Sequence, residues 1–268
     1  MNITDITITS LETITMFDIQ TGAYLGTMDE LQNATIEQSE EKTDITGKQG
    51  RKLASLKRNK SVKISGANGI ISHALMEQQT GSSFENKAVE VMWTDYITVP
   101  ATVADTATAF KAIGTAGAEI IGLYVKNANG SLGTKLVQDT EAAAGKFAYD
   151  PSTKNISLHS DITAGTELVA YYKRMITADT LANKSSKMSG RCKMYIDAMG
   201  EDRCNNVYRV QFYIPKCDWE GNFSLQMGDS QTVHNFSAEA LGSPACGAGS
   251  DFFTYTVFGA NATDAPAA

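Results

Sequence analysis

Alternating apolar and polar residues run through much of the chain and predict strands. The clearest case is the stretch 208–241. From Tyr208 to Ile214, apolar side chains fall on one face of an extended segment, and Arg209 and Gln211 fall on the other. Pro215 cannot donate a ladder hydrogen bond, so this strand is expected to stop there. A turn at 218–221 and a second alternation over 223–227 then predict a β-meander.

The segment 68–79 has the clearest helical spacing in the chain. Its apolar residues Ile70, Ile71, Ala74 and Leu75 recur at i, i+1, i+4 and i+5 and share one face. Asn68 is a suitable N-cap, and a glycine at 81 suits the residue after the last turn. One helix packed on a sheet is therefore expected.

Residues 39–52 separate two regions of strand composition. The segment is polar, charged and interrupted by two glycines, and it has too few apolar residues to pack as an element. We therefore expect a long projecting loop there. The preceding residues 29–38 fit either a strand or a short helical turn, and 53–65 returns to the sheet.

The middle of the chain differs in character. After Pro100 come short apolar runs separated by turn sequences such as Asn127–Gly130 and Pro151–Asn155. This spacing predicts a small β domain inserted at 96–176. The core domain would then comprise residues 1–95 and 177–258, and 259–268, which are small and polar, would form a flexible tail.

The composition is that of a β-rich globular protein of 268 residues, with 42% hydrophobic and 20% charged residues and a net charge of −7. The longest apolar runs fall far short of the roughly 20 residues that a membrane helix needs. The first residues have neither a basic start nor an apolar segment typical of a signal peptide. We expect a cytosolic, unprocessed product with no membrane anchor.

Charge is distributed unevenly along the first 63 residues. Residues 1–41 contain eight acidic and no basic side chains, whereas 42–63 contain eight basic side chains and a single acid, Asp44. One interpretation is that the acidic segment of one subunit faces the basic segment of a neighbour and guides assembly. The alternative is that both segments are solvated, since exposed charges contribute little individually. Nucleic-acid binding is less favoured because no aromatic residues interleave with Lys57–Lys60.

Motifs for chemistry are missing from the sequence. The four cysteines, Cys192, Cys204, Cys217 and Cys246, lack CxxC spacing, and we expect free, partly buried thiols. His73 has no evident catalytic partner, and the pair His159 and Asp161 is insufficient for a metal site. No phosphate-binding loop occurs. We expect no enzyme activity, no metal and no cofactor.

The order of elements resembles that of the major tail tube proteins of long-tailed bacteriophages. The resemblance lies in an N-terminal strand, a charged loop at 40–52, a strand at 60–65, the helix at 68–79 and the C-terminal phrases IPK, WEGNFSLQMGD and FSAEAL. It covers the chain outside the insert. It implies a mainly β fold in which two packed antiparallel sheets form a sandwich or barrel, flanked by one α-helix.

The resemblance also implies a role as a structural protein of the virion tail, assembled in the host cytoplasm. Such subunits form rings, usually hexameric, that stack into a hollow tube through which DNA passes without specific binding. The implied partners are further copies of the chain and the tape measure, tail terminator and distal tail proteins. The alternative is another phage structural β protein, such as a head decoration, baseplate or adhesion module.

Two groups of residues are the candidate contacts between subunits. The loop that reaches an adjacent ring, with the basic segment after it, contributes Glu40, Glu41, Lys42, Lys48, Arg51, Lys52, Lys57, Arg58 and Lys60. The meander that would form an inter-subunit sheet contributes Arg209, Gln211, Tyr213, Trp219 and Phe223.

Overall fold

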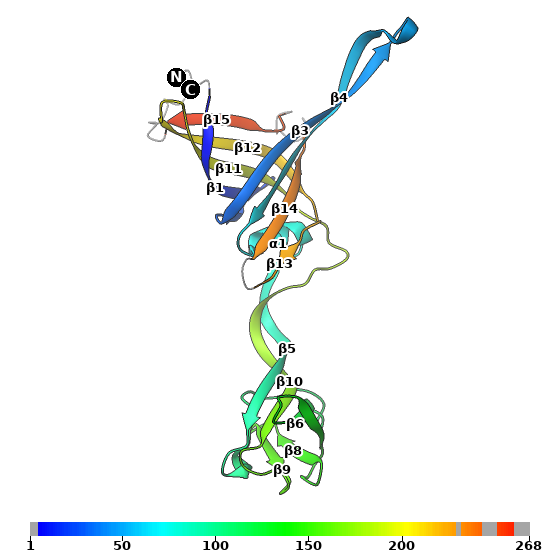
Figure 1. Cartoon of the computed structure of the whole chain (residues 1–268), viewed down its shortest axis with the longest axis vertical. Coiled ribbons are helices and arrows are strands. Elements are labelled where there is room, and N and C mark those ends of the chain that lie inside the picture. Colours follow the sequence, from blue (N-terminus) through cyan, green and yellow to red (C-terminus); the bar gives the residue numbers. More distant parts are fainter. Residues whose placement is uncertain (1–4, 229–231, 243–250, 260–268) are drawn as a thin grey trace. The chain divides into compact units, whose positions relative to one another are not determined.

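The computed structural model describes residues 5–228, 232–242 and 251–259 (Figure 1). The protein is mainly β, with two sheets and a single α-helix among the described residues, which confirms the predicted fold class. The predicted tail beyond 259 and the thiol Cys246 lie outside the described residues.

The chain divides into two compact units, one formed by residues 1–84 with 181–268 and the other by 85–180. Two long strands, β5 (Phe84–Thr98) and β10 (Glu167–Leu181), run across the positions 96 and 176 at which the sequence suggested an insert. Each unit has its own sheet and its own buried core.

The first unit contains a nine-stranded antiparallel sheet. The order along it is β2 (Tyr24–Met28), β1 (Thr7–Asp18), β11 (Arg191–Glu201), β12 (Val207–Trp219), β14 (Val233–Ala240), β4 (Lys52–Asn68) and β3 (Leu31–Thr46). The short β13 (Leu225–Gln226) pairs with β14, and β15 (Thr254–Gly259) pairs with β12. The second strand predicted for the meander, 223–227, is thus reduced to two residues.

Both halves of this sheet contribute to one core. Ile14 and Met194 from β1 and β11 belong to the same buried cluster as Ile64 and Phe236 from β4 and β14. Figure 1 shows β14, β4 and β3 crossing β1, β11 and β12. Alternate residues of every strand point to the same side and make one face of the sheet apolar. The sheet bends over this face and buries it, as in a sandwich or barrel.

Strand β12 passes through Pro215, so the prediction that the strand stops there is wrong. On β11, Cys192 and Met194 are separated by one residue, whereas their partners Cys217 and Ile214 are separated by two. This β-bulge holds Pro215 at a position where the ladder is interrupted. The missing N–H is therefore tolerated within the strand.

The helix α1 spans His73–Thr80 and starts later than predicted. Its N-cap is Ser72, whose side chain accepts a hydrogen bond from the Leu75 N–H (3.3 Å), and not Asn68, which ends β4. Gly81 ends the helix in the left-handed conformation, as its position suggested. The helix packs on β2, where a Cβ at Gly26 would overlap the side chain of Ala74.

The segment 40–52 is an extended hairpin, so the prediction of a loop is wrong. β3 and β4 pair with each other from Leu31 and Asn68 to Thr46 and Lys52, and a 3-10 turn at Lys48–Gly50 connects them. The absence of a buried face led to the incorrect prediction. A ladder satisfies the backbone hydrogen bonds of both strands without any such face.

The second unit contains a six-stranded sheet in the order β5, β10, β6 (Ile120–Lys126), β7 (Leu132–Gln138), β8 (Lys146–Asp150) and β9 (Asn155–Leu158). Its core includes Leu123, Phe147 and Tyr172. The Tyr172 hydroxyl donates to Asp95 (2.6 Å), and Asp95 also accepts the Ala109 N–H (2.7 Å). This network holds the loop between β5 and β6 against the sheet. The same loop contains a short 3-10 turn, η2 (Val103–Asp105).

Candidate inter-subunit surfaces

The outer part of the β3–β4 hairpin, residues 39–61, is named here the distal hairpin. Strand β14 pairs with β4 only from Val62 to Asn68, so beyond this point β3 and β4 pair with each other alone. The ten residues 52–61 of β4 reach about 30 Å at the rise of an extended strand. Figure 1 shows this hairpin projecting from the sheet of the first unit.

The acidic and basic strands of the distal hairpin face each other within one chain. Lys57 binds Glu40 and Lys52 binds Asp44, each with an N–O distance of 2.7 Å. The hydrogen bond and charge of Lys57 lower the pKa of Glu40, and Glu40 raises the pKa of Lys57. Part of the charge asymmetry of the sequence is therefore neutralised inside the subunit.

A surplus of positive charge nevertheless remains on the distal hairpin. It has seven basic and three acidic side chains. Glu41 accepts a hydrogen bond from Asn59 (2.6 Å), and Arg58 donates to Thr43 (3.2 Å). Lys60 lies over the ring of Phe252, 5.7 Å from its centroid.

The other predicted contacts of this group lie along β3 and near the turn; they are Lys42, Lys48 and Arg51. All nine predicted residues are therefore located on one projecting element.

Three apolar side chains on the distal hairpin are exposed, and the sequence analysis missed them. Ile45, Leu53 and Leu56 have exposed fractions of 43, 65 and 52%. Ile45 is opposite Ala54, and Leu56 is opposite Thr43, so Ile45 and Leu56 share one face of the ribbon. Large apolar residues gathered at the end of a charged, projecting element are typical of a contact surface. Treating 39–61 as a hairpin at the sequence level would have shown that these apolar residues gather near its end.

The second predicted group of contacts does not lie at an edge of the sheet. β12 pairs with β11 on one side and with β15 and β14 on the other. Arg209, Gln211 and Tyr213 point to the outer face, whereas Trp219 is buried in the core, with 2% of its surface exposed, and Phe223 packs against His234. The backbone of β12 is thus occupied within the subunit, and the strands at the two ends of the sheet are β2 and β3.

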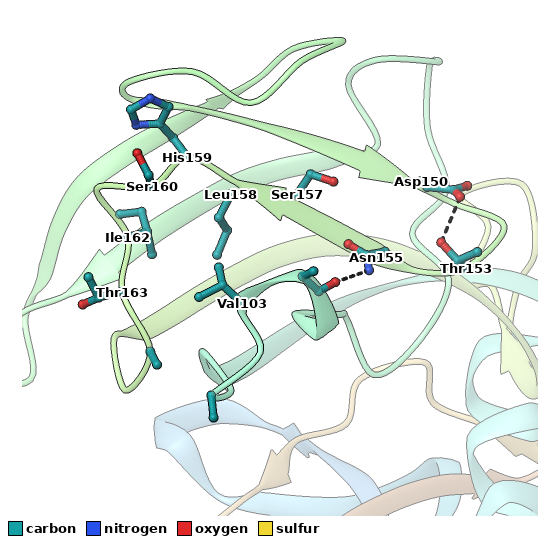
Figure 2. Close-up of a pocket in the computed structure, with 13 residues that line it drawn as sticks. Val103, Asp150, Thr153, Asn155, Ser157, Leu158, His159, Ser160, Ile162 and Thr163 are labelled. Atoms are coloured by element: carbon teal, nitrogen blue, oxygen red, sulfur yellow. Dashed lines mark hydrogen bonds between the residues drawn. The ribbon is translucent and has the colours of Figure 1, made fainter.

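A shallow pocket of about 980 Å³ lies in the second unit beside β9 (Figure 2). His159 and Ser160 lie at one end, and Asp150 and Thr153 lie at the other. The His159 Nδ1 contacts Asp161 (2.6 Å), and hydrogen bonds from Ser152 and Thr153 lower the pKa of Asp150 to about 2. These polar groups stabilise their own turns and do not converge on a common point.

Among the described residues, no three His, Cys, Asp or Glu side chains are placed to hold a metal ion. In that same part of the chain, no helix is long and apolar enough to cross a membrane. The three described cysteines are free thiols, with Cys192 and Cys217 buried and Cys204 exposed.

A projecting hairpin that exposes apolar and basic side chains is a surface suited to contact with another protein molecule. Family comparison agrees. The chain belongs to the YomU/Tube protein family, which it matches over residues 6–250, a range that encloses the second unit. This is a family of phage-type tube structural proteins. No curated protein matches the chain.

Proposed function

We propose that this chain is the major tail tube subunit of a long-tailed bacteriophage. Copies form rings, hexameric in this proposal, which stack into a hollow conduit for DNA. The observation that carries the proposal is the distal hairpin. It extends about 30 Å beyond Val62, the last residue of β4 that pairs with β14, and exposes apolar and basic side chains at its end. Family membership supports a tube component of the virion tail.

A contact between the hairpin of one copy and a different surface of the next copy would have head-to-tail symmetry. A projecting element that binds a different surface on the next copy makes a head-to-tail interface, and this interface generates an open filament when the rotation does not close. In the proposed tube the distal hairpin makes the axial contact between rings. The outer face of β12, with Arg209, Gln211 and Tyr213, remains a candidate for contacts through side chains.

The remaining parts of the proposal concern the lumen and the partners. Carboxylates lining the lumen would repel the phosphate backbone, so DNA would pass without specific binding, and the net charge of −7 supports this idea. Besides copies of itself, the subunit would contact the tape measure, tail terminator and distal tail proteins. A reconstruction of the tube with a basic inner wall would contradict the lumen hypothesis.

Electron microscopy of the purified protein tests the proposal directly. A tube subunit is expected to polymerise into hollow rods of constant diameter. The alternative, a head decoration, baseplate or adhesion module, would remain monomeric or form small closed oligomers. Protein that stays in such species over a range of concentration and salt would therefore contradict the tube proposal.

Charge reversal tests the role of the basic segment. Changing Lys57, Arg58 and Lys60 together to Glu turns the surplus of base on the distal hairpin into a surplus of acid and removes the Lys57–Glu40 pair. We expect the critical concentration for assembly, measured by sedimentation, to rise about tenfold or more, and its dependence on salt to weaken, because charge complementarity between subunits is lost.

A matched control reverses three exposed lysines elsewhere, Lys111, Lys184 and Lys187. This variant carries the same change in net charge and should assemble as the original protein does. Equal effects of the two triple variants, or no effect of the first, would show that the basic segment does not guide assembly.

A further inference from the structure

Four aromatic rings cross the outer face of the sheet in the first unit. They are Tyr24 on β2, Phe17 on β1, Tyr195 on β11 and Tyr213 on β12, and we name them the aromatic face. The ring centroids of Phe17 lie 6.0 Å from Tyr24 and 5.7 Å from Tyr195, and Tyr195 stacks on Tyr213 at 4.7 Å. Their chain neighbours, such as Met16 and Met194, point to the core on the other side of the sheet.

The aromatic face is hollowed and flanked by charges. A groove of about 460 Å³ is lined by Thr15, Phe17, Gly22, Lys193, Tyr195 and Asp197. Tyr24, at the end strand of the sheet, exposes 63% of its surface. The lining carries one cation and one carboxylate, Lys193 and Asp197, so its net charge is balanced. Aromatic rings packed in a row on a solvated sheet face form a surface suited to apolar side chains, and the ring faces also attract cations.

We propose that the aromatic face receives the distal hairpin of a second copy of this chain. This inference rests on the proposed function and names the acceptor surface for the hairpin. The hairpin brings the exposed Leu53 and Leu56, together with a surplus of basic side chains. The apolar side chains pack on the rings, and Lys or Arg cations lie over ring faces and near Asp197.

The hairpin does not occupy the aromatic face of its own chain. Leu53 and Tyr24 are both more than half exposed within one subunit, and the outer part of β4 pairs with β3 alone. Because donor and acceptor are different surfaces, each copy that receives a hairpin still offers its own, and the contact propagates. A pair of copies that exchanged hairpins would instead form a closed dimer.

Photo-crosslinking tests the assignment. Leu53 is replaced by a benzophenone amino acid, and this protein is mixed with ¹⁵N-labelled original protein, allowed to assemble and irradiated. We expect crosslinked peptides that join the hairpin to the labelled segments 15–24 or 193–197. Rods that form with crosslinks elsewhere would overturn the acceptor surface and leave the proposed function intact. Failure to assemble under any condition, with no crosslink, would contradict both.

A pair of tyrosine variants gives an independent measurement. Tyr24→Ser is expected to raise the critical concentration for assembly about tenfold, since it removes an exposed ring from the contact. Tyr96→Ser in the second unit, where the ring is also exposed, is the matched control and should have no effect. Normal assembly of Tyr24→Ser would overturn the proposal.

Discussion

Trp219 connects three strands of the first unit. Its indole N–H donates to the Cys192 sulfur on β11 (3.1 Å), and its ring meets Phe236 on β14 edge to face, with centroids 6.1 Å apart. Only 2% of the side chain is exposed. The sequence suggested a turn residue at a subunit contact, but the strand continues through the bulge at Pro215 and carries Trp219 into the core.

The variant Trp219→Ala should destabilise the first unit by about 3–5 kcal/mol, because truncating a buried aromatic side chain removes its packing and leaves a cavity. Trp219→Phe keeps most of the volume and should cost less. Urea unfolding followed by circular dichroism measures both. Trp93→Ala is the control, since Trp93 lies in the second unit. An unchanged transition for Trp219→Ala would show that the site repacks without loss.

At the residue scale, sequence reasoning identified faces but not neighbours. Alternation correctly placed Val210 and Ile214 inward. It could not show that β15 and β14 cover the second edge of β12, because such pairing joins residues far apart in sequence. The aromatic face was missed for the same reason, since its rings come from four separate segments.

Among the elements, the hairpin and the helix show two different limits of sequence analysis. The distal hairpin has no buried face, so an argument from apolar periodicity predicted a loop, although strand pairing alone defines it. The helix was correctly expected, but its start was placed four residues or more too early, because both Asn68 and Ser72 are good N-caps. Tertiary contacts decide between them, since Asn68 lies opposite His234 in the sheet.

His234 ties α1 to β14 from a fully buried position. Its Nδ1 accepts the Ser72 N–H (3.4 Å), so Nε2 carries the proton and donates to the Gln79 side-chain oxygen (2.7 Å). Gln79 in turn donates to the Asn235 carbonyl (3.1 Å). A proton on Nδ1 would point at the Ser72 N–H and repel it, so this arrangement favours the neutral imidazole. Its two hydrogen bonds connect it to the first and last turns of α1.

Burial lowers the pKa of His234 below its ordinary value of 6.5, which makes the stability of the first unit depend on pH. The unfolded chain binds a proton as pH falls below about 6.5, whereas the folded chain resists it, so stability is present above that pH and is lost below it. His234→Gln should be less stable at pH 8 but should show a flatter decline between pH 7 and pH 5. Urea unfolding at each pH measures this.

The control for this experiment is His159→Gln, which removes an exposed imidazole in the second unit. It should leave the pH dependence of the first unit unchanged. Equal slopes for the original protein and His234→Gln would mean that the pKa of His234 is the same in the folded and unfolded chain. His234 would then have no role in acid sensitivity.

The two units of the molecule have separate cores, and only the first unit carries the proposed assembly surfaces. The change in composition after Pro100 indicated a second β-rich region, and the structure gives residues 85–180 a sheet and core of their own. Both proposed assembly surfaces, the distal hairpin and the aromatic face, belong to the first unit. The hydrogen bond between Asn86 and Asp179 (2.6 Å) brings together the two ends at which the second unit joins the chain.

Replacing residues 88–177 by a short Gly-Ser linker should therefore leave a protein that folds and assembles. Its ends are already adjacent, so closing the loop costs little, since loop entropy depends weakly on length. Circular dichroism and the fluorescence of Trp219 report folding, and electron microscopy reports rods. A second deletion, removing residues 44–54 at the end of the hairpin, should fold yet fail to assemble. Folded protein without rods in the first deletion would move the assembly surface to the second unit. Rods in the second deletion would show that the end of the hairpin is not needed for assembly.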